Sequence, residues 1–214
     1  LADITRHPVR EYLRSLIWDG EKRCETLFID YLGAEDSRYT RTVTRKALIG
    51  AAARILSPGC KHDHMLVLIG PQGCRKSTTL KKLGKEWFSD SLYTMSGKDA
   101  YEQLQGFWII ELSEMAATRK AEVEQIKQFV SKQEDNYRAA YARRTQCHPR
   151  QCAFFGTTND EEFLRDPTGA RRFWPVVVTD AGKTLGDKLT ASIVDQIWAE
   201  AVTYYEAGET WYLD

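Results

Sequence analysis

The sequence predicts an α/β fold with helical segments at both ends, and three observations lead to this prediction. From residue 65 onward, short apolar runs alternate with amphipathic helices, as strands and helices do in an α/β sheet. The first sixty residues show helical spacing of apolar residues without such runs. The chain returns to helical spacing near its end. We therefore expect a helical subdomain over residues 1–60, an α/β core over 61–180 and a C-terminal helical segment over 181–214.

Each expected element follows from the spacing of its apolar residues and from the residues that bound it. Pro8 suits the first turn of a helix, whereas Asp19-Gly20, Gly33 and Ser57-Pro58-Gly59 end helices. Helices are expected at about residues 7–17, 24–32, 41–56, 76–85, 98–104, 121–134 and 188–207. Apolar runs predict strands over residues 65–69, 108–112, 153–157 and 174–178.

Composition indicates a globular chain with a substantial core. The 214 residues are 43% hydrophobic, which excludes intrinsic disorder, and thirty basic residues balance thirty acidic ones. Zero net charge argues against a globally basic nucleic-acid binder but not against a local basic patch. No apolar run approaches the roughly 18 residues of a membrane span. Five cysteines without a Cys-x-x-Cys pattern favour reduced thiols in the cytoplasm. Because Leu1 is not Met, we expect a piece of a larger protein.

A glycine-rich run between the first expected strand and the next helix predicts a phosphate-binding loop. Backbone N–H groups at the start of a helix form a nest for anions. Lys76 would reach the terminal phosphates of ATP, and the Ser77 hydroxyl would complete the coordination of Mg²⁺. The expected nucleotide-binding residues are Gly70, Gln72, Gly73, Cys74, Arg75, Lys76, Ser77 and Thr78. The alternative is an ordinary glycine turn between a strand and a helix.

Arg75 departs from the phosphate-loop pattern, which has a second glycine at this position. Glycine is favoured there because the backbone approaches phosphate closely and adopts positive φ. A side chain in the left-handed region costs roughly 1–2 kcal/mol. The positive charge of Arg75 compensates in part, so we expect weakened nucleotide binding and not its loss.

Polar residues that follow the second and third long strands are candidates for catalysis. Glu111 and Glu114 stand at the end of one strand, where α/β sheets bind ligands. Glu111 is expected to hold Mg²⁺ and Glu114 to polarise the attacking water, although these roles are interchangeable. Asn159 follows another strand and would face the same crevice. The alternatives are solvated acids and a simple turn.

Paired arginines precede the last expected strand. The guanidinium of Arg171 or Arg172 would meet phosphate oxygens in a bidentate manner. Such a finger, supplied by an adjacent subunit, raises turnover by roughly 10³–10⁵. The alternative is a surface pair bonded to acids such as Asp166.

A basic segment lies between the expected strands at 108–112 and 153–157. Residues 118–150 hold eight basic and four acidic side chains, so this segment carries a charge of +4 in a neutral chain. Arginines interleaved with tyrosines are suited to contacting a single-stranded DNA backbone and stacking bases. The alternative is a solvated helix and a charged hairpin. The expected nucleic-acid contacts are Lys132, Arg138, Tyr141, Arg143 and Arg144.

Together these motifs resemble the virulence-associated protein E family of phage and mobile-element ATPases, which are similar to superfamily 3 and primase-associated helicases. The resemblance covers nearly the whole chain. Its most specific parts are Gly156-Thr157-Thr158-Asn159 and, later, Arg171-Arg172-Phe173-Trp174-Pro175. The other matching parts are the phosphate loop, Pro8–Leu13, Trp18–Gly20, Asp30–Gly33, Asp63–Leu68, Glu111–Glu114 and Arg119–Glu122.

The resemblance implies an AAA+-like P-loop NTPase with a three-layer αβα core. It implies that Lys76 and Ser77 bind phosphate and Mg²⁺, that Glu111 and Glu114 are the metal-and-water acids and that Asn159 is the sensor. Arg171 or Arg172 would be the finger. The expected function is a ring-forming ATPase that moves on DNA during replication of a phage or mobile element. The alternative is a catalytically weak nucleotide- or DNA-binding assembly module. A small-molecule phosphoryl transferase is disfavoured, because no acceptor pocket is identifiable.

Overall fold

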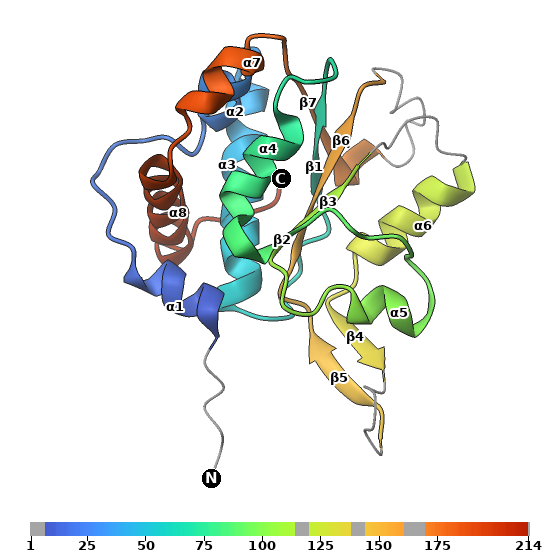
Figure 1. Ribbon diagram of the computed structural model, residues 1–214. Helices are drawn as coiled ribbons and strands as arrows, with labels where there is room; N and C mark the ends of the chain where they lie inside the picture. Colours follow the sequence, from blue (N-terminus) through green and yellow to red (C-terminus); the bar gives the residue numbers. More distant parts are fainter. Residues whose placement is uncertain (1–6, 114–119, 138–143, 161–169, 214) are drawn as a thin grey trace.

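The computed structural model describes residues 7–113, 120–137, 144–160 and 170–213. Its central sheet contains β1 (Met65–Ile69), β2 (Phe88–Ser89), β3 (Ile109–Leu112), β6 (Ala153–Thr158) and β7 (Phe173–Val177). These strands run in the order β2-β3-β6-β1-β7, and their described pairings are all parallel (Figure 1). An antiparallel hairpin is formed by β4 (Glu134–Tyr137) and β5 (Gln146–Pro149). The α/β class with a parallel sheet is confirmed.

Eight α-helices are described, and three of them precede the sheet. The helices are α1 (Pro8–Ser15), α2 (Leu27–Leu32), α3 (Arg38–Leu56), α4 (Lys76–Gly84), α5 (Gly97–Glu102), α6 (Lys120–Val130), α7 (Gly182–Leu185) and α8 (Ala191–Glu206). Short 3₁₀ turns are η1 (Lys85–Trp87), η3 (Ala170–Arg172) and η4 (Gly186–Lys188). Among the described helices, none is both long and apolar enough to cross a lipid bilayer.

Helices cover both faces of the sheet because its strands are apolar on both faces. Leu66 and Leu68 of β1 belong to one buried cluster, together with α3, α4 and α8. Val67, between them, belongs to a second cluster with α5 and α6. This alternation is what the two-residue period of a strand requires. Figure 1 shows the resulting arrangement, with α3, α4 and α8 on one side of the sheet and α5 and α6 on the other.

The helical ends of the chain pack onto the sheet through one continuous core. The first cluster joins Leu13 of α1, Leu48 of α3 and Trp198 of α8 to the strands. The rings of Trp108 and Trp198 lie 4.2 Å apart, and both are fully buried. Their indole N–H groups donate to the carbonyls of Ala51 and Leu83, so neither buried polar group is left unpaired. The expected boundaries near residues 60 and 180 stay predictions.

Local sequence explains where the helices begin. The His7 side chain accepts a hydrogen bond from the Arg10 amide, and Pro8 occupies the first turn of α1. Ser37 caps α3 and Thr190 caps α8 through their hydroxyls. Each cap satisfies an N–H group that the helix itself leaves unbonded.

The structure differs from the expected elements mainly around the hairpin. The helix expected over residues 121–134 ends at Val130, and β4 begins at Glu134. The apolar spacing of the helix stops at Val130, while Asp135 and Tyr137 alternate with exposed residues as in a strand. The helix expected from residue 24 begins at Leu27. The sequence analysis missed β2, because two residues carry no periodic signal.

Candidate functional site

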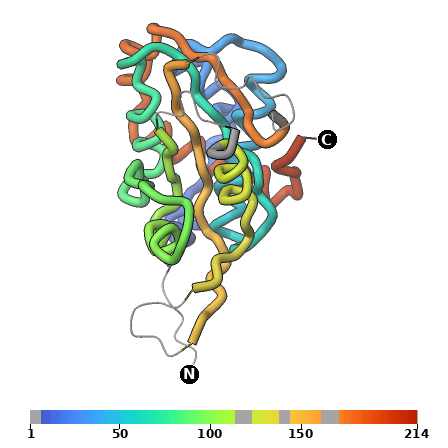
Figure 2. Tube along the Cα trace, turned by 90° about the vertical axis from the view of Figure 1, so that its right-hand side faces the viewer, coloured from blue at the N-terminus to red at the C-terminus, as the bar shows by residue number. Residues whose placement is uncertain are grey.

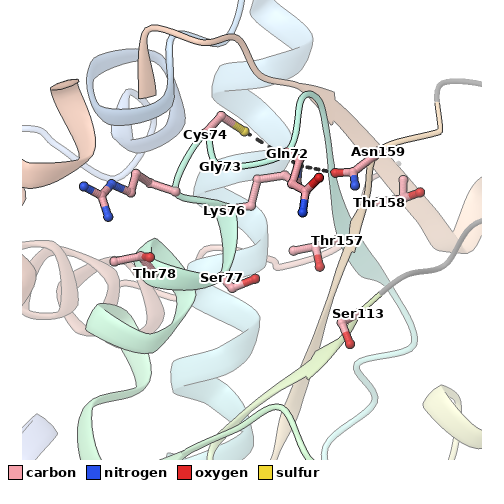
Figure 3. Close-up of a pocket in the computed structure, with 11 residues that line it drawn as sticks. Gln72, Gly73, Cys74, Lys76, Ser77, Thr78, Ser113, Thr157, Thr158 and Asn159 are labelled. Carbon is pink, nitrogen blue, oxygen red and sulfur yellow. Dashed lines mark hydrogen bonds between the residues drawn. The ribbon is translucent and has the colours of Figure 1, made fainter. Parts of the chain in front are cut away.

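A glycine-rich loop connects the carboxyl end of β1 to the first turn of α4. Beside it lies a cavity of about 340 Å³ (Figure 3). The strands β1 and β6 pair in parallel, so their carboxyl ends open onto the same edge of the sheet. The cavity is lined by Gln72, Gly73, Cys74, Arg75, Lys76, Ser77, Thr78, Ser113, Thr157, Thr158 and Asn159.

Two residues of the glycine-rich loop have left-handed backbone conformations. Gly73 has a φ of 82° and Arg75 a φ of 69°, both in the left-handed region. For Arg75 this conformation costs roughly 1–2 kcal/mol relative to glycine. The expectation that position 75 requires positive φ is therefore confirmed. The Arg75 guanidinium lies 3.3 Å from an Asp187 carboxylate oxygen, which links the loop to η4.

Gly70 has a different task from the lining residues. A Cβ atom there would stand 2.4 Å from the carbonyl oxygen of Val178. The Gly70 amide donates to the Thr158 carbonyl at 3.2 Å. Gly70 thus allows the turn after β1 to pass between β6 and β7, and it does not line the cavity.

The Lys76 side chain lies against the loop and is only 8% exposed. Its Nζ donates to the carbonyl oxygens of Gly70 at 2.6 Å and Pro71 at 2.9 Å. It also donates to Asn159 Oδ1 at 2.9 Å, and Cys74 Sγ lies 3.6 Å away. Figure 3 shows Lys76 and Asn159 directed toward one another across the cavity. The ammonium group is therefore held among oxygen acceptors at the place predicted for phosphate binding.

A second hydrogen-bonded group joins α4 to two strands. Ser77 Oγ and Thr157 Oγ1 each donate to Glu111 Oε1 at 2.6 Å. Glu111 is 2% exposed, and its other oxygen, Oε2, has no hydrogen-bond partner among the described residues. A buried carboxylate oxygen without a donor is costly, and it is a ligand that a hard cation prefers. This donor set fits the predicted Mg²⁺ site.

The predicted acids and arginines are not all gathered at this cavity. Glu114 lies outside the described residues. Arg171 and Arg172 belong to η3, directly before β7, and they do not line the cavity. Phe173 pairs with Met65, the first residue of β1, whereas the loop follows the last residue of that strand. The arginines therefore lie at the amino edge of the sheet, opposite the cavity of their own chain.

The predicted nucleic-acid contacts fall in and around the β4–β5 hairpin, and Arg138, Tyr141 and Arg143 lie outside the described residues. Arg144 is exposed. Lys132 donates to the Tyr101 hydroxyl and lies over its ring, so its charge is already engaged. Tyr137, one of the tyrosines interleaved with these arginines in the sequence, is only 7% exposed and stacks on His148. It lies on the buried face of β4, so its ring is not available for stacking on bases.

The hairpin projects from the body at the end away from the cavity. β5 ends at Pro149 and leads directly into the amino end of β6, and Gly59, before β1, donates to the Arg150 carbonyl. Figures 1 and 2 both show the hairpin extending beyond the amino ends of the sheet strands. The hairpin and the phosphate loop thus lie at opposite ends of the sheet strands.

Sequence reasoning missed three residues that line the cavity, Ser113, Thr157 and Thr158. Thr157 stands in the Gly-Thr-Thr-Asn motif, but only Asn159 was assigned a role. Strand alternation would have found it, because Thr157 shares a face of β6 with Phe155 and so faces α4.

Fold and cavity together define the class of protein. It is an α/β protein with a parallel sheet and a polar cavity beside a glycine-rich loop at the carboxyl edge. The chain belongs to the family of the virulence-associated protein E-like domain, which matches residues 13–214. The resemblance seen in the motifs is thereby confirmed.

Solved structures support the same fold. The apo structure of the NrS-1 C-terminal region is similar with a TM-score of 0.59 and 16% identity, and the similarity covers 87% of this chain and 48% of that one. Its A form gives a TM-score of 0.60 at 13% identity with the same two coverages. Another A-form structure gives 0.51 at 17%, covering 88% and 45%. The chain thus spans about half the length of the structures it matches. No curated protein matches the sequence.

Proposed function

We propose that the chain is a Mg²⁺-dependent ATPase of the P-loop, AAA+-like class that moves on DNA during replication of a phage or mobile element. One observation carries this proposal: Lys76, Ser77 and Asn159 line one cavity, and the buried Glu111 accepts a hydrogen bond from Ser77 beside it. These residues come from three separate segments. A plain glycine turn would need neither a buried lysine nor a buried carboxylate beside it. Membership of the virulence-associated protein E-like family supports the replication role.

Each residue has a definite task in this proposal. Amide groups at the start of α4 bind phosphate oxygens. Lys76 breaks its hydrogen bonds to the carbonyl oxygens of Gly70 and Pro71 and contacts the terminal phosphates instead. Ser77 and Glu111 hold Mg²⁺, which neutralises charge on the phosphate oxygens when bound. Asn159, released from Lys76, orients the attacking water. These tasks require no rearrangement of the strands.

The position of the arginines favours a site shared between subunits. Arg171 and Arg172 stand at the edge of the sheet opposite their own cavity, so within one chain they do not reach a nucleotide there. A neighbouring copy in a cytoplasmic ring would supply them to the next cavity. The hairpin, with Arg144 and the adjoining basic residues, would contact single-stranded DNA.

The decisive experiment measures ATP hydrolysis with and without single-stranded DNA. We expect DNA to stimulate turnover in the unmodified chain, and Lys76→Ala to abolish hydrolysis. The matched control is Lys81→Ala, which removes an exposed lysine from the same helix and should leave turnover intact. Unaltered hydrolysis in Lys76→Ala would refute the assigned site, provided that thermal unfolding shows both variants folded.

A second candidate function is a catalytically weak assembly module, and the geometry of Arg75 favours it. The loop holds an arginine in a left-handed conformation where the pattern has glycine. Its side chain is paired with Asp187, so its charge is partly neutralised. Under this reading the natural chain binds DNA or other subunits without turnover, and Arg75→Gly switches on nucleotide binding.

A further inference from the structure

The Gly-Thr-Thr-Asn motif contains a threonine to which the proposed function assigns no task. Thr157 is the fifth residue of β6 and is 4% exposed. It pairs with Leu68 of β1, and its neighbour Gly156 pairs with Leu112 of β3. Thr157 therefore stands in the middle of the sheet, where its hydroxyl has to find a partner within the protein.

The partner of Thr157 is the carboxylate of Glu111. Phe155 of β6 and Ile109 of β3 both belong to the cluster on the α4 side of the sheet. Thr157 and Glu111, two residues further along their strands, point to that same side. There Thr157 Oγ1 and Ser77 Oγ both donate to Oε1, each at 2.6 Å.

The two donors divide the carboxylate into a held oxygen and a free one. Glu111 Oε1 accepts two short hydrogen bonds, whereas the buried Oε2 accepts none among the described residues. Holding one oxygen from two sides restricts rotation of the carboxylate plane, which fixes the direction of the other. Without Thr157, a single hydrogen bond from Ser77 would hold Oε1, and one bond restricts this rotation less than two do.

We propose that Thr157 is a positioning residue that orients Glu111 toward Mg²⁺. This inference rests on the proposed ATPase function and deepens it. Thr157 acts through the carboxylate, to which its hydroxyl donates directly. Its removal should therefore weaken the Mg²⁺-dependent part of nucleotide binding and spare the part that the loop amides and Lys76 supply alone.

The test has two measurements. The first is a titration with Mg²⁺ that follows nucleotide binding, and the second is calorimetry of ATP binding in Mg²⁺ and in EDTA. Thr157→Val keeps the shape of the side chain and removes the donor. A lost hydrogen bond to a charged group predicts an increase of about tenfold in the Mg²⁺ concentration at half-saturation. ATP binding in EDTA should stay unchanged, and Thr157→Ser should restore the Mg²⁺ response.

The control is Thr44→Val, which removes a buried threonine donor inside α3. Thr44 does not line the cavity. It should leave the Mg²⁺ titration unchanged. If Thr157→Val does not fold, Thr157→Ala replaces it with the same expected result. Equal losses of ATP affinity in Mg²⁺ and in EDTA would overturn the positioning role of Thr157. An unchanged Mg²⁺ titration in Thr157→Val would overturn it as well, provided that the unmodified chain binds Mg·ATP. No Mg²⁺-dependent binding in the unmodified chain would instead overturn the ATPase proposal, and the inference with it.

Discussion

Lys76 and Asn159 stand 83 residues apart in the sequence, yet the lysine Nζ donates a 2.9 Å hydrogen bond to the asparagine Oδ1. The bond connects the first turn of α4 to the end of β6. Both groups are ones that the proposed mechanism directs toward the terminal phosphate. In this structure the asparagine oxygen accepts from the lysine, so each satisfies part of the hydrogen-bonding capacity of the other.

Replacing Asn159 tests this relationship. Asn159→Ala should reduce the turnover number for ATP by about 100-fold while leaving KM within a small factor, because a lost positioning contact acts mainly in the transition state. Steady-state hydrolysis assays provide the measurement. A rise in KM at constant turnover would show that Asn159 serves substrate binding and not orientation of the water.

Arg75→Gly separates the two proposed functions. Glycine adopts the observed φ of 69° without strain, so we expect tighter nucleotide binding. The strain relieved is offset in part by the greater conformational entropy of glycine in the unfolded chain, so the net change in unfolding free energy should stay within about 1 kcal/mol. Under the ATPase proposal, the natural chain already binds Mg·ATP and the variant binds it more tightly. Binding confined to the variant would favour the assembly module. Asp187→Ala is the control for the ion pair alone.

Mixing two inactive variants tests whether the site is shared between subunits. Lys76→Ala lacks the phosphate-binding lysine, and Arg171→Ala/Arg172→Ala lacks the proposed finger. In a ring mixed at equal amounts, about a quarter of the interfaces would combine an intact lysine with an intact arginine from the neighbour. We expect hydrolysis to reappear on mixing. Its absence, with mixed assemblies shown by size-exclusion chromatography, would contradict a finger supplied in trans.

Arg144→Ala tests the hairpin as a DNA-binding element. A lost phosphate contact should weaken single-stranded DNA binding similarly for all sequences and lower the salt slope by about one. Lys98→Ala, which removes an exposed lysine that pairs with Glu102, is the matched control. Fluorescence anisotropy at several salt concentrations measures both quantities. An unchanged slope would remove Arg144 from the proposed DNA contacts.

His62 predicts how stability depends on pH. It is buried beside Gly50 of α3, and burial together with the charge of Arg54 lowers the pKa of His62 to about 3. The unfolded chain has the usual pKa of 6.5, so below that value it binds a proton that the folded chain does not. Stability should fall as pH drops from about 6.5 toward 3, by up to about 1.4 kcal/mol per pH unit. His62→Gln should flatten this slope in denaturant unfolding experiments; an unaltered slope would contradict it.

Most elements could be predicted from the sequence, because they depend on local periodicity and on the residues that end them. The strand at 65–69 matches β1 in both bounds, and the start of α4 follows from the glycine run before Lys76. The hairpin could not be predicted in this way. Glu134–Tyr137 is mostly polar, so it carries no apolar strand signal, and it acquires its partner, Gln146–Pro149, only on folding.

For the site, the sequence by itself determined which groups are available: the loop, Lys76, Ser77, Glu111 and Asn159. Tertiary structure decided which of them meet. Parallel pairing of β1 with β6, and of β6 with β3, sets their carboxyl ends side by side and adds Thr157 to the group. The same pairing places Arg171 and Arg172 at the far edge, because β7 runs in the same direction as β1. Sequence spacing carries no information on these distances, since strand order and register are properties of the folded sheet alone.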